Sequence, residues 1–385
     1  MDVTGKYISV ESFMDKKKIV VIGPVYPYKG GISHYTGLLV RALSKYNDVI
    51  CVSYKMQYPK LLMKKEQRDY SDRTFEIKDT KYLINTANPF NIIKSASEIK
   101  KMKPDAVIVS WWHPYFAPCY MILLNHLKGI RKGFICHNVF PHERFPLDRW
   151  LTKNTLKKGN FAIVHSAMDE DDLRTILPNM DICRHVHPSY DVFKVRDITR
   201  EDARRELGIT SEAKILLFFG FVRKYKGLDV LIRAMKDINE DIKLYVVGEF
   251  GEDRDEYISL MKENEVYDRI TIKDGYIPNS EVEPYFAAAD LCVCPYHSAT
   301  QSGIVQISFG LGLPVLVTSV GGLPDVVDDG KTGFVVPPDN PKAVADTVNK
   351  YFNENMAEEI RAGVKKEQER FSWDKMAEAI NGMLK

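Results

Sequence analysis

Short apolar segments alternate with amphipathic segments along almost the whole of this 385-residue chain. Residues 17–23 form an apolar run, and residues 30–46 follow with apolar side chains at the spacing of a helix. Strands separated by helices predict βαβ units, and therefore parallel sheets with helices on their faces. The other strand-like runs lie at 49–54, 105–112, 133–138, 161–166, 214–220, 243–248, 269–276, 290–296, 314–319 and 333–338.

The length of the chain predicts two domains, because a single hydrophobic core rarely grows beyond about 250–300 residues. The alternation pauses at 187–201 and then restarts as a second series. We place a first domain at 1–190 and a second at 191–372, and we expect a helix at 373–385 to cross back to the first. Each domain is expected to be a doubly wound, Rossmann-like parallel sheet. Ligands bind such sheets at the carboxyl ends of the strands, which here face a cleft between the domains.

The composition excludes several classes of protein. No run approaches the roughly eighteen apolar residues of a membrane-spanning helix, and the first residues lack the apolar segment of a secretory signal. The six cysteines form no Cys-x-x-Cys pair, which is typical of reduced core residues in the cytosol. The nine histidines form no HExxH motif and no zinc spacing with cysteine.

The two halves of the chain carry opposite charge. Residues 1–190 hold 29 Lys and Arg against 18 Asp and Glu, whereas the remainder holds 25 against 34. A basic half suits an acidic acceptor or an anionic membrane, and a merely solvated surface explains it equally well. The segment 58–68 joins Leu61, Leu62 and Met63 to Lys64, Lys65 and Arg68, which favours an anionic bilayer. We expect a cytoplasmic protein, with peripheral attachment to the inner face of the cell membrane as a hypothesis, and no nucleic-acid partner.

Gly30 and Gly31 follow the first strand and open a helix. Glycine lets the backbone approach a ligand, and the helix N-terminus offers free N–H groups to an anion, although a tight turn alone also explains the pair. The pattern is not Gly-x-Gly-x-x-Gly, and no acidic residue stands where a dehydrogenase holds the ribose. A nicotinamide enzyme is therefore not expected.

Two loops of the second half suit phosphate. Arg223 and Lys226 lie between a strand end and the next helix, where two cations suit a diphosphate. Thr300, Gln301 and Ser302 precede Gly303 at the start of an apolar helix, which resembles a helix cap whose backbone amides are free for phosphate.

These loops together resemble the retaining glycosyltransferases of family 4, over about residues 17–380. The quoted motifs are PVYPYKGGISHYT, GFVRKYKGLDVLIRA, GYIPNSEVEPYFAAADLCVCPY, SGIVQISFGLGLPV and VTSVGGLPDVVDDGKTGFVVPPDNP, in the order of the family. The resemblance implies the GT-B architecture of that family, in which two Rossmann-like domains face each other and the second binds a nucleotide sugar.

The resemblance also implies roles for single residues. Arg223 and Lys226 match the phosphate-binding pair, and His137 matches a histidine near the donor sugar. Gly30 and Gly31 match a loop beside the diphosphate. Further donor contacts are implied for Tyr276 and Ile277 at the base, and for Gly303, Ile304 and Val305 at the distal phosphate.

One departure concerns the paired glutamates that the family carries eight positions apart. In one alignment with the family these two positions are Thr300 and Ser308, and in an alignment shifted by one residue they are Ala299 and Ile307. Neither alignment places a glutamate at either position. The hydroxyl of Thr300 and the amide of Gln301 are candidates to take over the sugar contacts. The sequence resembles a branch of the family with a Thr-Gln-Ser-Gly loop, which also fits CHNVFPHE at 136–143.

Some residues have competing interpretations. Asp169, Glu170 and Asp171 contain the Asp-x-Asp pattern of metal-dependent glycosyltransferases, but they follow Ser166 where a helix begins, so we interpret them as helix-start residues and expect no metal. Trp112 and His113 follow a strand and either stack on an acceptor sugar or fill the domain. His142 and Glu143 either bind the acceptor or fix their loop.

The expected activity is that of a retaining, metal-independent hexosyltransferase that uses a UDP- or GDP-linked sugar as co-substrate and no other cofactor. The acceptor is expected to be a hydroxyl of a glycan, a glycolipid or a polyprenyl-linked molecule. Two alternatives stay open. A nucleotide-sugar 2-epimerase needs no acceptor, and a non-catalytic nucleotide-sugar-binding protein is compatible with the missing glutamates.

Overall fold

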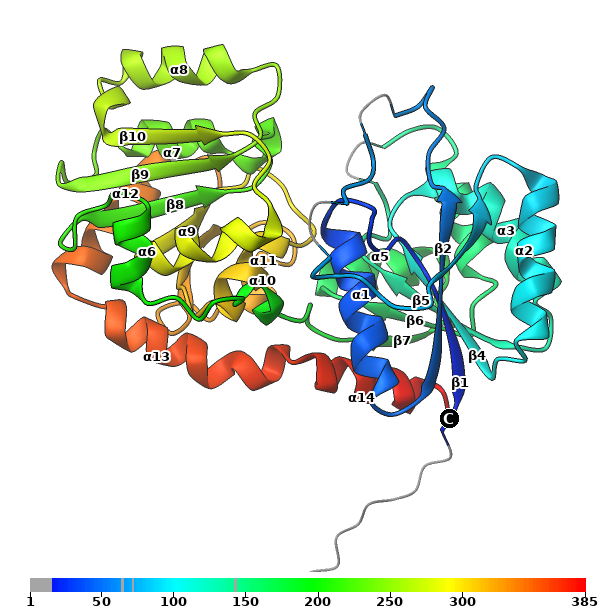
Figure 1. The fold of residues 1–385 in the computed structure, drawn as a ribbon. Helices are drawn as coiled ribbons and strands as arrows, with labels where there is room; N and C mark the ends of the chain where they lie inside the picture. Colours follow the sequence, from blue (N-terminus) through cyan, green and yellow to red (C-terminus); the bar gives the residue numbers. More distant parts are fainter. Residues whose placement is uncertain (1–15, 64–65, 71–72, 142–143) are drawn as a thin grey trace, which may run out of the picture.

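The computed structural model describes residues 16–63, 66–70, 73–141 and 144–385, and these fold into two parallel α/β domains that lie side by side (Figure 1). The first sheet has seven strands in the order β3-β2-β1-β4-β5-β6-β7, and all neighbours run parallel. The strands are β1 (Lys18–Ile22), β2 (Asp48–Met56), β3 (Lys81–Asn85), β4 (Ala106–Trp111), β5 (Arg131–Cys136), β6 (Phe161–Val164) and β7 (Asp181–Arg184).

Helices cover both faces of the first sheet. They are α1 (Gly31–Ser44), α2 (Pro89–Lys101), the 3-10 turn η1 (Pro114–Phe116), α3 (Ala117–His126), α4 (Asp148–Leu156) and α5 (Ala167–Ile176). Their starts follow from the sequence: the side chain of Asn88 accepts the N–H of Asn91 at α2, and that of Ser166 accepts the N–H of Asp169 at α5. Each cap satisfies an amide that lacks a partner within its helix.

The second sheet has six strands in the order β10-β9-β8-β11-β12-β13, again parallel. The strands are β8 (Lys214–Phe219), β9 (Ile242–Gly248), β10 (Ile270–Asp274), β11 (Leu291–Cys294), β12 (Val315–Thr318) and β13 (Gly333–Val336). The helices are α6 (Arg200–Glu206), α7 (Leu228–Ala234), α8 (Arg254–Glu263), α9 (Val282–Ala288), α10 (Gly303–Gly310), α11 (Leu323–Val326), α12 (Pro341–Asn353), α13 (Ala357–Glu367) and α14 (Trp373–Met383). Two doubly wound sheets confirm the predicted fold class.

Both faces of the first sheet are buried. Along β1, Val20 and Ile22 belong to the core that α2 and α3 complete, whereas Ile19 and Val21 belong to the core beneath α1 and α14. A parallel sheet with helices on both faces needs such continuous apolar strands, which is why the alternation of the sequence predicted it.

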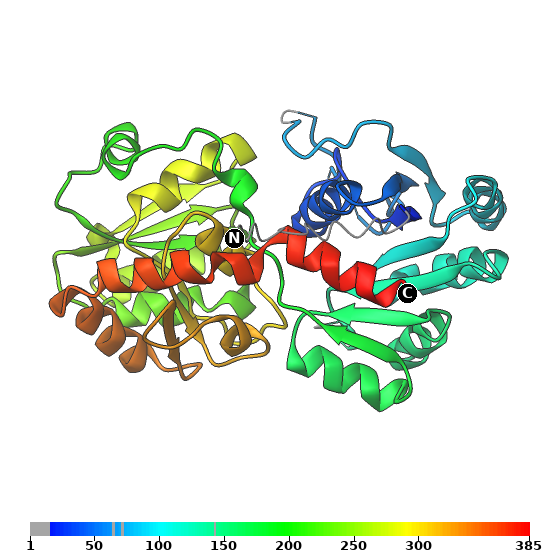
Figure 2. The same cartoon turned by 90° about the horizontal axis from the view of Figure 1, so that it is seen from below.

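The chain crosses between the domains twice, and Figure 2 shows the second crossing running beneath both domains through α13 and α14. On α13, Arg361 donates to the carbonyl oxygen of Ala289 at 2.8 Å in the second domain. On α14, Asp374 pairs at 2.6 Å with Lys45, the residue that follows α1. Trp373 Nε1 donates to the carbonyl oxygen of Ser189 at 2.9 Å, which ties the two crossings together.

The strand order places the chemistry between the domains. The order reverses beside β1 in the first sheet and beside β8 in the second, and ligands bind doubly wound sheets at such points. Within the described part of the chain, no helix has both the length and the apolarity needed to cross a bilayer.

Candidate active site between the domains

A cavity of about 800 Å³ lies between the domains and is lined by loops of both. Most of the donor-binding residues proposed from the sequence line it. From the first domain come Gly30, Gly31 and the segment around Tyr58 and Gln67. The second domain and the first crossing supply Tyr190, Gly220, Arg223, Lys226, Tyr276, Ile277, Tyr296, Gln301, Ser302, Gly303 and Ile304.

Gly30 and Gly31 connect β1 to α1 at the wall of this cavity. Gly30 has φ 102°, which residues with a side chain rarely adopt, and α1 starts at the next residue. No side chain caps α1, so its first amides stay available at the cavity.

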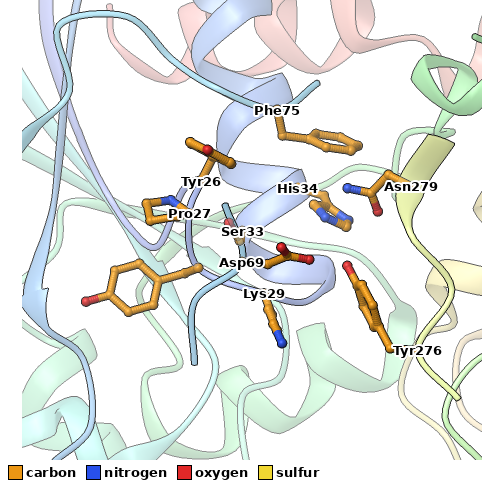
Figure 3. Close-up of a pocket in the computed structure, with 10 residues that line it drawn as sticks. Tyr26, Pro27, Lys29, Ser33, His34, Asp69, Phe75, Tyr276 and Asn279 are labelled. Carbon is orange, nitrogen blue, oxygen red and sulfur yellow. The ribbon is translucent and has the colours of Figure 1, made fainter. Parts of the chain in front are cut away.

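A small pocket opens beside the cavity where the two domains touch, and Figure 3 shows its lining. Lys29 and His34 of the first domain face Tyr276 and Asn279 of the second (Figure 3). The Lys29 ammonium lies 5.3 Å from the centre of the Tyr276 ring, and the His34 ring stacks on Phe75 at 4.0 Å. Tyr276, which the family resemblance assigns to the base of the donor, therefore lies against the glycine loop of the other domain.

Lys226 is a buried cation without a counter-charge. It ends the 3-10 turn η3 (Lys224–Lys226) and is 8% exposed. Its ammonium makes no hydrogen bond or ion pair with any residue that the structure describes and lies 5.9 Å from the centre of the Tyr296 ring. Burial lowers the pKa of the Lys226 ammonium from 10.5 to about 8. The guanidinium of Arg223 donates only to the carbonyl oxygen of Val222, at 3.3 Å, among the described residues. Two unneutralised cations at one cavity suit an anionic ligand.

The N-terminus of α10 faces the same cavity. Ser302 caps the helix, accepting the N–H of Val305 at 3.4 Å, and its hydroxyl lies 3.2 Å from that of Tyr296. The amides of Gly303 and Ile304 have no partner within the helix. Of the three amides proposed for the distal phosphate, that of Val305 is thus already used by the cap.

The loop that replaces the paired glutamates contacts the first domain. The hydroxyl of Thr300 donates to the side-chain oxygen of Asn138, and Thr300 does not line the cavity. The amide of Gln301 donates to the carbonyl oxygen of His165 at 3.0 Å, and its own oxygen is buried without a partner among the described residues. Of Thr300 and Gln301, only Gln301 lines the cavity, and its side-chain oxygen is available to a ligand.

The glycine pair at 321–322 has a packing role beneath this loop. A Cβ on Gly321 would lie 1.7 Å from the carbonyl oxygen of Ala299, and one on Gly322 would lie 2.3 Å from the amide nitrogen of Gln301. The Gly-Gly-Leu-Pro-Asp motif therefore allows the loop to approach α11 closely.

His137 follows β5 and belongs to a buried aromatic cluster. Its ring lies 4.6 Å from that of Tyr35, and its Nε2 atom is buried without a partner among the described residues. Burial and the nearby His187 lower the pKa of His137 to about 3, and burial lowers the pKa of His187 to about 4. The pKa of His165 is also lowered, well below its usual range. These imidazoles are therefore neutral hydrogen-bonding groups. Sequence reasoning missed Tyr35 and His165, because only the fold brings them together.

The acceptor candidates lie apart from the cavity. Trp112 is almost fully buried and its Nε1 donates to the hydroxyl of Tyr58 at 3.2 Å. His113 accepts the N–H of Tyr115 at 3.0 Å and stacks on Phe145 with ring centres 6.0 Å apart. His142 and Glu143 lie outside the described residues.

Asp169 fixes the start of α5. Its carboxylate accepts the hydroxyl of Ser166 at 2.6 Å and the N–H of Val139 at 3.2 Å, and burial raises its pKa to about 6. Among the described residues, no three His, Cys, Asp or Glu side chains lie close enough together to hold a metal ion.

Residues 199–371, which make up most of the second domain, match the family of glycosyl transferases group 1, as the motifs predicted. A D-inositol 3-phosphate glycosyltransferase of Xylanimonas cellulosilytica is 28% identical over 247 residues, which are 61% of this chain and 59% of the relative. The chain spans about half the length of the curated relatives that it matches.

Two solved structures have the same two-domain arrangement. Sucrose-phosphate synthase from Thermosynechococcus elongatus superposes with a TM-score of 0.75 at 19% identity, covering 96% of this chain and 98% of the other. HepE of Anabaena, solved in complex with UDP, gives a TM-score of 0.74 at 14% identity, covering 96% and 99%. At these identities the likeness shows the fold, which is the GT-B architecture.

Proposed function

We propose that this protein is a glycosyltransferase that moves a sugar from a nucleoside-diphosphate sugar to an acceptor hydroxyl, with retention of the anomeric configuration. The observation that carries the proposal is the buried, unneutralised ammonium of Lys226, which faces a cavity between two Rossmann-like domains together with Arg223 and the start of α10. Burying a cation is unfavourable unless an anion compensates it, and the diphosphate of the donor is that anion.

Lys226, Arg223 and the amides of Gly303 and Ile304 bind the diphosphate in this proposal. When the bond between the sugar and the diphosphate breaks, negative charge grows on the leaving phosphate. Preorganised cations and N–H groups in a water-poor site stabilise that charge. They supply what a metal ion supplies elsewhere, so we propose that transfer needs no metal and no cofactor besides the donor.

The donor lies across the cleft in this proposal. Tyr276 and Ile277 contact the base, and Gly30 and Gly31 approach the diphosphate from the other side. The base is uracil or guanine, and the UDP complex of HepE supports the first. The sugar lies beside Gln301, whose unpartnered amide oxygen accepts a hydroxyl. His137, which is neutral and does not line the cavity, is proposed near the sugar from the family resemblance.

A leaving phosphate oxygen accepts the proton of the acceptor hydroxyl in the retaining mechanism that we propose, so no carboxylate base is needed. The acceptor is a hydroxyl of a glycan, a glycolipid or a polyprenyl-linked molecule. The acceptor approaches from the first domain. The protein acts at the cytoplasmic face of the membrane as a peripheral enzyme.

The proposal is tested by a screen of UDP- and GDP-linked sugars against the melting temperature. A ligand at a hundred times its dissociation constant stabilises the folded state by about 2.7 kcal/mol, so the true donor is expected to raise the melting temperature by several degrees. A matched screen of Lys226→Met is expected to show a weaker response at the same donor concentration. If no nucleotide sugar stabilises the wild-type protein, the donor site is assigned wrongly. If the donor alone is epimerised, the enzyme is an epimerase.

A further inference from the structure

The most exposed apolar side chains of the described residues gather in the first domain. Leu61 is 87% exposed, Phe90 84%, Leu147 70% and Trp150 57%, and Leu62 and Tyr70 are also more than half exposed. In the rest of the described chain, Val195 is the one large apolar side chain that exceeds half exposure. Water-exposed apolar side chains concentrated in one region indicate an interaction surface.

These six side chains share one edge of the first sheet, and we call them the apolar rim. Leu61, Leu62 and Tyr70 lie in the connection after β2, Phe90 lies in the first turn of α2 after β3, and the pair Leu147 and Trp150 flanks the start of α4 after β5. Because all seven strands run parallel, the connections that follow them emerge at the same edge, and Figure 1 shows the one after β2 at the upper edge of the first domain.

Side-chain contacts join these connections into one surface. The hydroxyl of Thr86, just before α2, donates to the carbonyl oxygen of Gln57 after β2 at 2.8 Å and lies 2.9 Å from the hydroxyl of Tyr115 after β4. His113 after β4 stacks on Phe145 after β5. These contacts link the connections that follow β2, β3, β4 and β5, which carry or adjoin the rim.

Basic side chains stand between the apolar ones. Lys60 precedes Leu61, Lys94 lies one turn beyond Phe90, Arg149 is next to Trp150, and Lys153 follows in the next turn of α4. All four are exposed and make no ion pair with any described residue. The nearby carboxylate of Asp148 is already paired with Arg144 at 2.5 Å.

We propose that the apolar rim docks on an anionic bilayer, with Phe90, Leu147 and Trp150 at the boundary between headgroups and acyl chains. A protein partner would be expected to meet a packed apolar centre, whereas here separate apolar anchors alternate with exposed cations, which suits a lipid surface. The proposed docking surface thus extends from Leu61 and Leu62 to the starts of α2 and α4. The proposal rests on the proposed function in one respect: the rim borders the cleft, so docking brings a lipid-carried acceptor to its entrance.

The test is sedimentation of the full chain with vesicles of phosphatidylcholine alone or with added phosphatidylglycerol, at low salt. The variant F90S/L147S/W150S is expected to bind the anionic vesicles at least about tenfold more weakly than wild type. The control V195S/Y267S removes two about half-exposed apolar side chains outside the rim and is expected to bind like wild type. Trp150 is the most exposed tryptophan, so a blue shift of emission on vesicle binding is expected in wild type and absent in Trp150→Phe.

Equal sedimentation of wild type and the triple variant, or no preference of wild type for anionic vesicles, overturns the proposal. So does a wild-type dimer that the triple variant breaks, because the rim would then be an interface between copies. The response of the melting temperature to nucleotide sugars is measured separately without vesicles. The triple variant is expected to keep that response, so a failure of docking and a failure of the donor site are told apart.

Discussion

Replacing Lys226 with methionine is expected to change turnover and stability in opposite directions. In the proposed reaction the ammonium stabilises charge that grows on the leaving diphosphate. Removing one such contact in a preorganised site costs about 2.7–4 kcal/mol of transition-state stabilisation, or roughly a hundred- to a thousandfold in turnover. Methionine is an unbranched, apolar side chain that can fill the space of the lysine stem.

The stability effect follows from the pKa of Lys226, which burial lowers from 10.5 to about 8. This difference corresponds to a cost of about 3 kcal/mol for holding the charged form in the folded state. Because the folded-state pKa lies below that of the unfolded chain, the cost is present in full below about pH 8 and disappears as the pH rises toward 10.5. The variant is therefore expected to melt several degrees above wild type at pH 7, and the gap is expected to close at alkaline pH.

The assay is the turnover number at saturating donor, measured beside melting curves at pH 7 and pH 10. Lys224→Met is the matched control. It lies in the same turn, but its side chain is 71% exposed and lies 3.7 Å from Asp253 and 3.8 Å from Glu256 in solvent. Such exposed pairs contribute little, so the control is expected to keep both turnover and melting temperature. A folded Lys226→Met protein with near-normal turnover, or one that is less stable than wild type, would refute the reasoning.

Three further outcomes are expected. Transfer continues in excess EDTA, and activity that EDTA abolishes and Mn²⁺ restores would contradict the metal-free site. Asp169→Ala is expected to lower the free energy of unfolding by about 1–2 kcal/mol in chemical denaturation, because it removes a contact at the start of α5. Asp171 is exposed, so Asp171→Ala is expected to leave the free energy of unfolding unchanged. If both variants lose activity equally and keep their stability, the two carboxylates form a metal site instead. Donor affinity measured by calorimetry falls as the pH rises above about 8, where Lys226 loses its proton in the free protein, and a flat profile to pH 10 would contradict the role of its charge.

The sequence predicted the central strands of both sheets but not two edge strands. β3 lies in a polar stretch with Ile84 as its one fully buried side chain, and no residue of β7 is fully buried. An edge strand packs against fewer neighbours, so it needs fewer apolar residues and leaves a weaker pattern. β1, β4 and β8, which are buried apart from the first residue of β1 and of β8, carry continuous apolar runs and were predicted within a residue or two.

The sequence predicted those residues of the candidate site that lie in loops directly after strands or beside glycines. Gly30, Arg223 and Gly303 were found because each lies between a strand and a helix, where the fold class puts ligands. The contact between Thr300 and Asn138 and the cluster around Tyr35 were not predictable, because they join residues far apart in the chain. Nor did the sequence reveal that Lys226 is buried, since a lysine in a polar loop is ordinarily solvated.

The measurement that tests the central claim most directly is the release of nucleoside diphosphate from the donor found by the melting screen, with and without a lipid or glycan acceptor extract. The account predicts release that depends on the acceptor, that yields a product with the anomeric configuration of the donor, and that falls at least about a hundredfold in Lys226→Met. Two results would contradict the assignment of sugar transfer to this cleft. In one, nucleoside diphosphate is released without any acceptor, and in the other, the donor binds but no acceptor extract leads to release of nucleoside diphosphate.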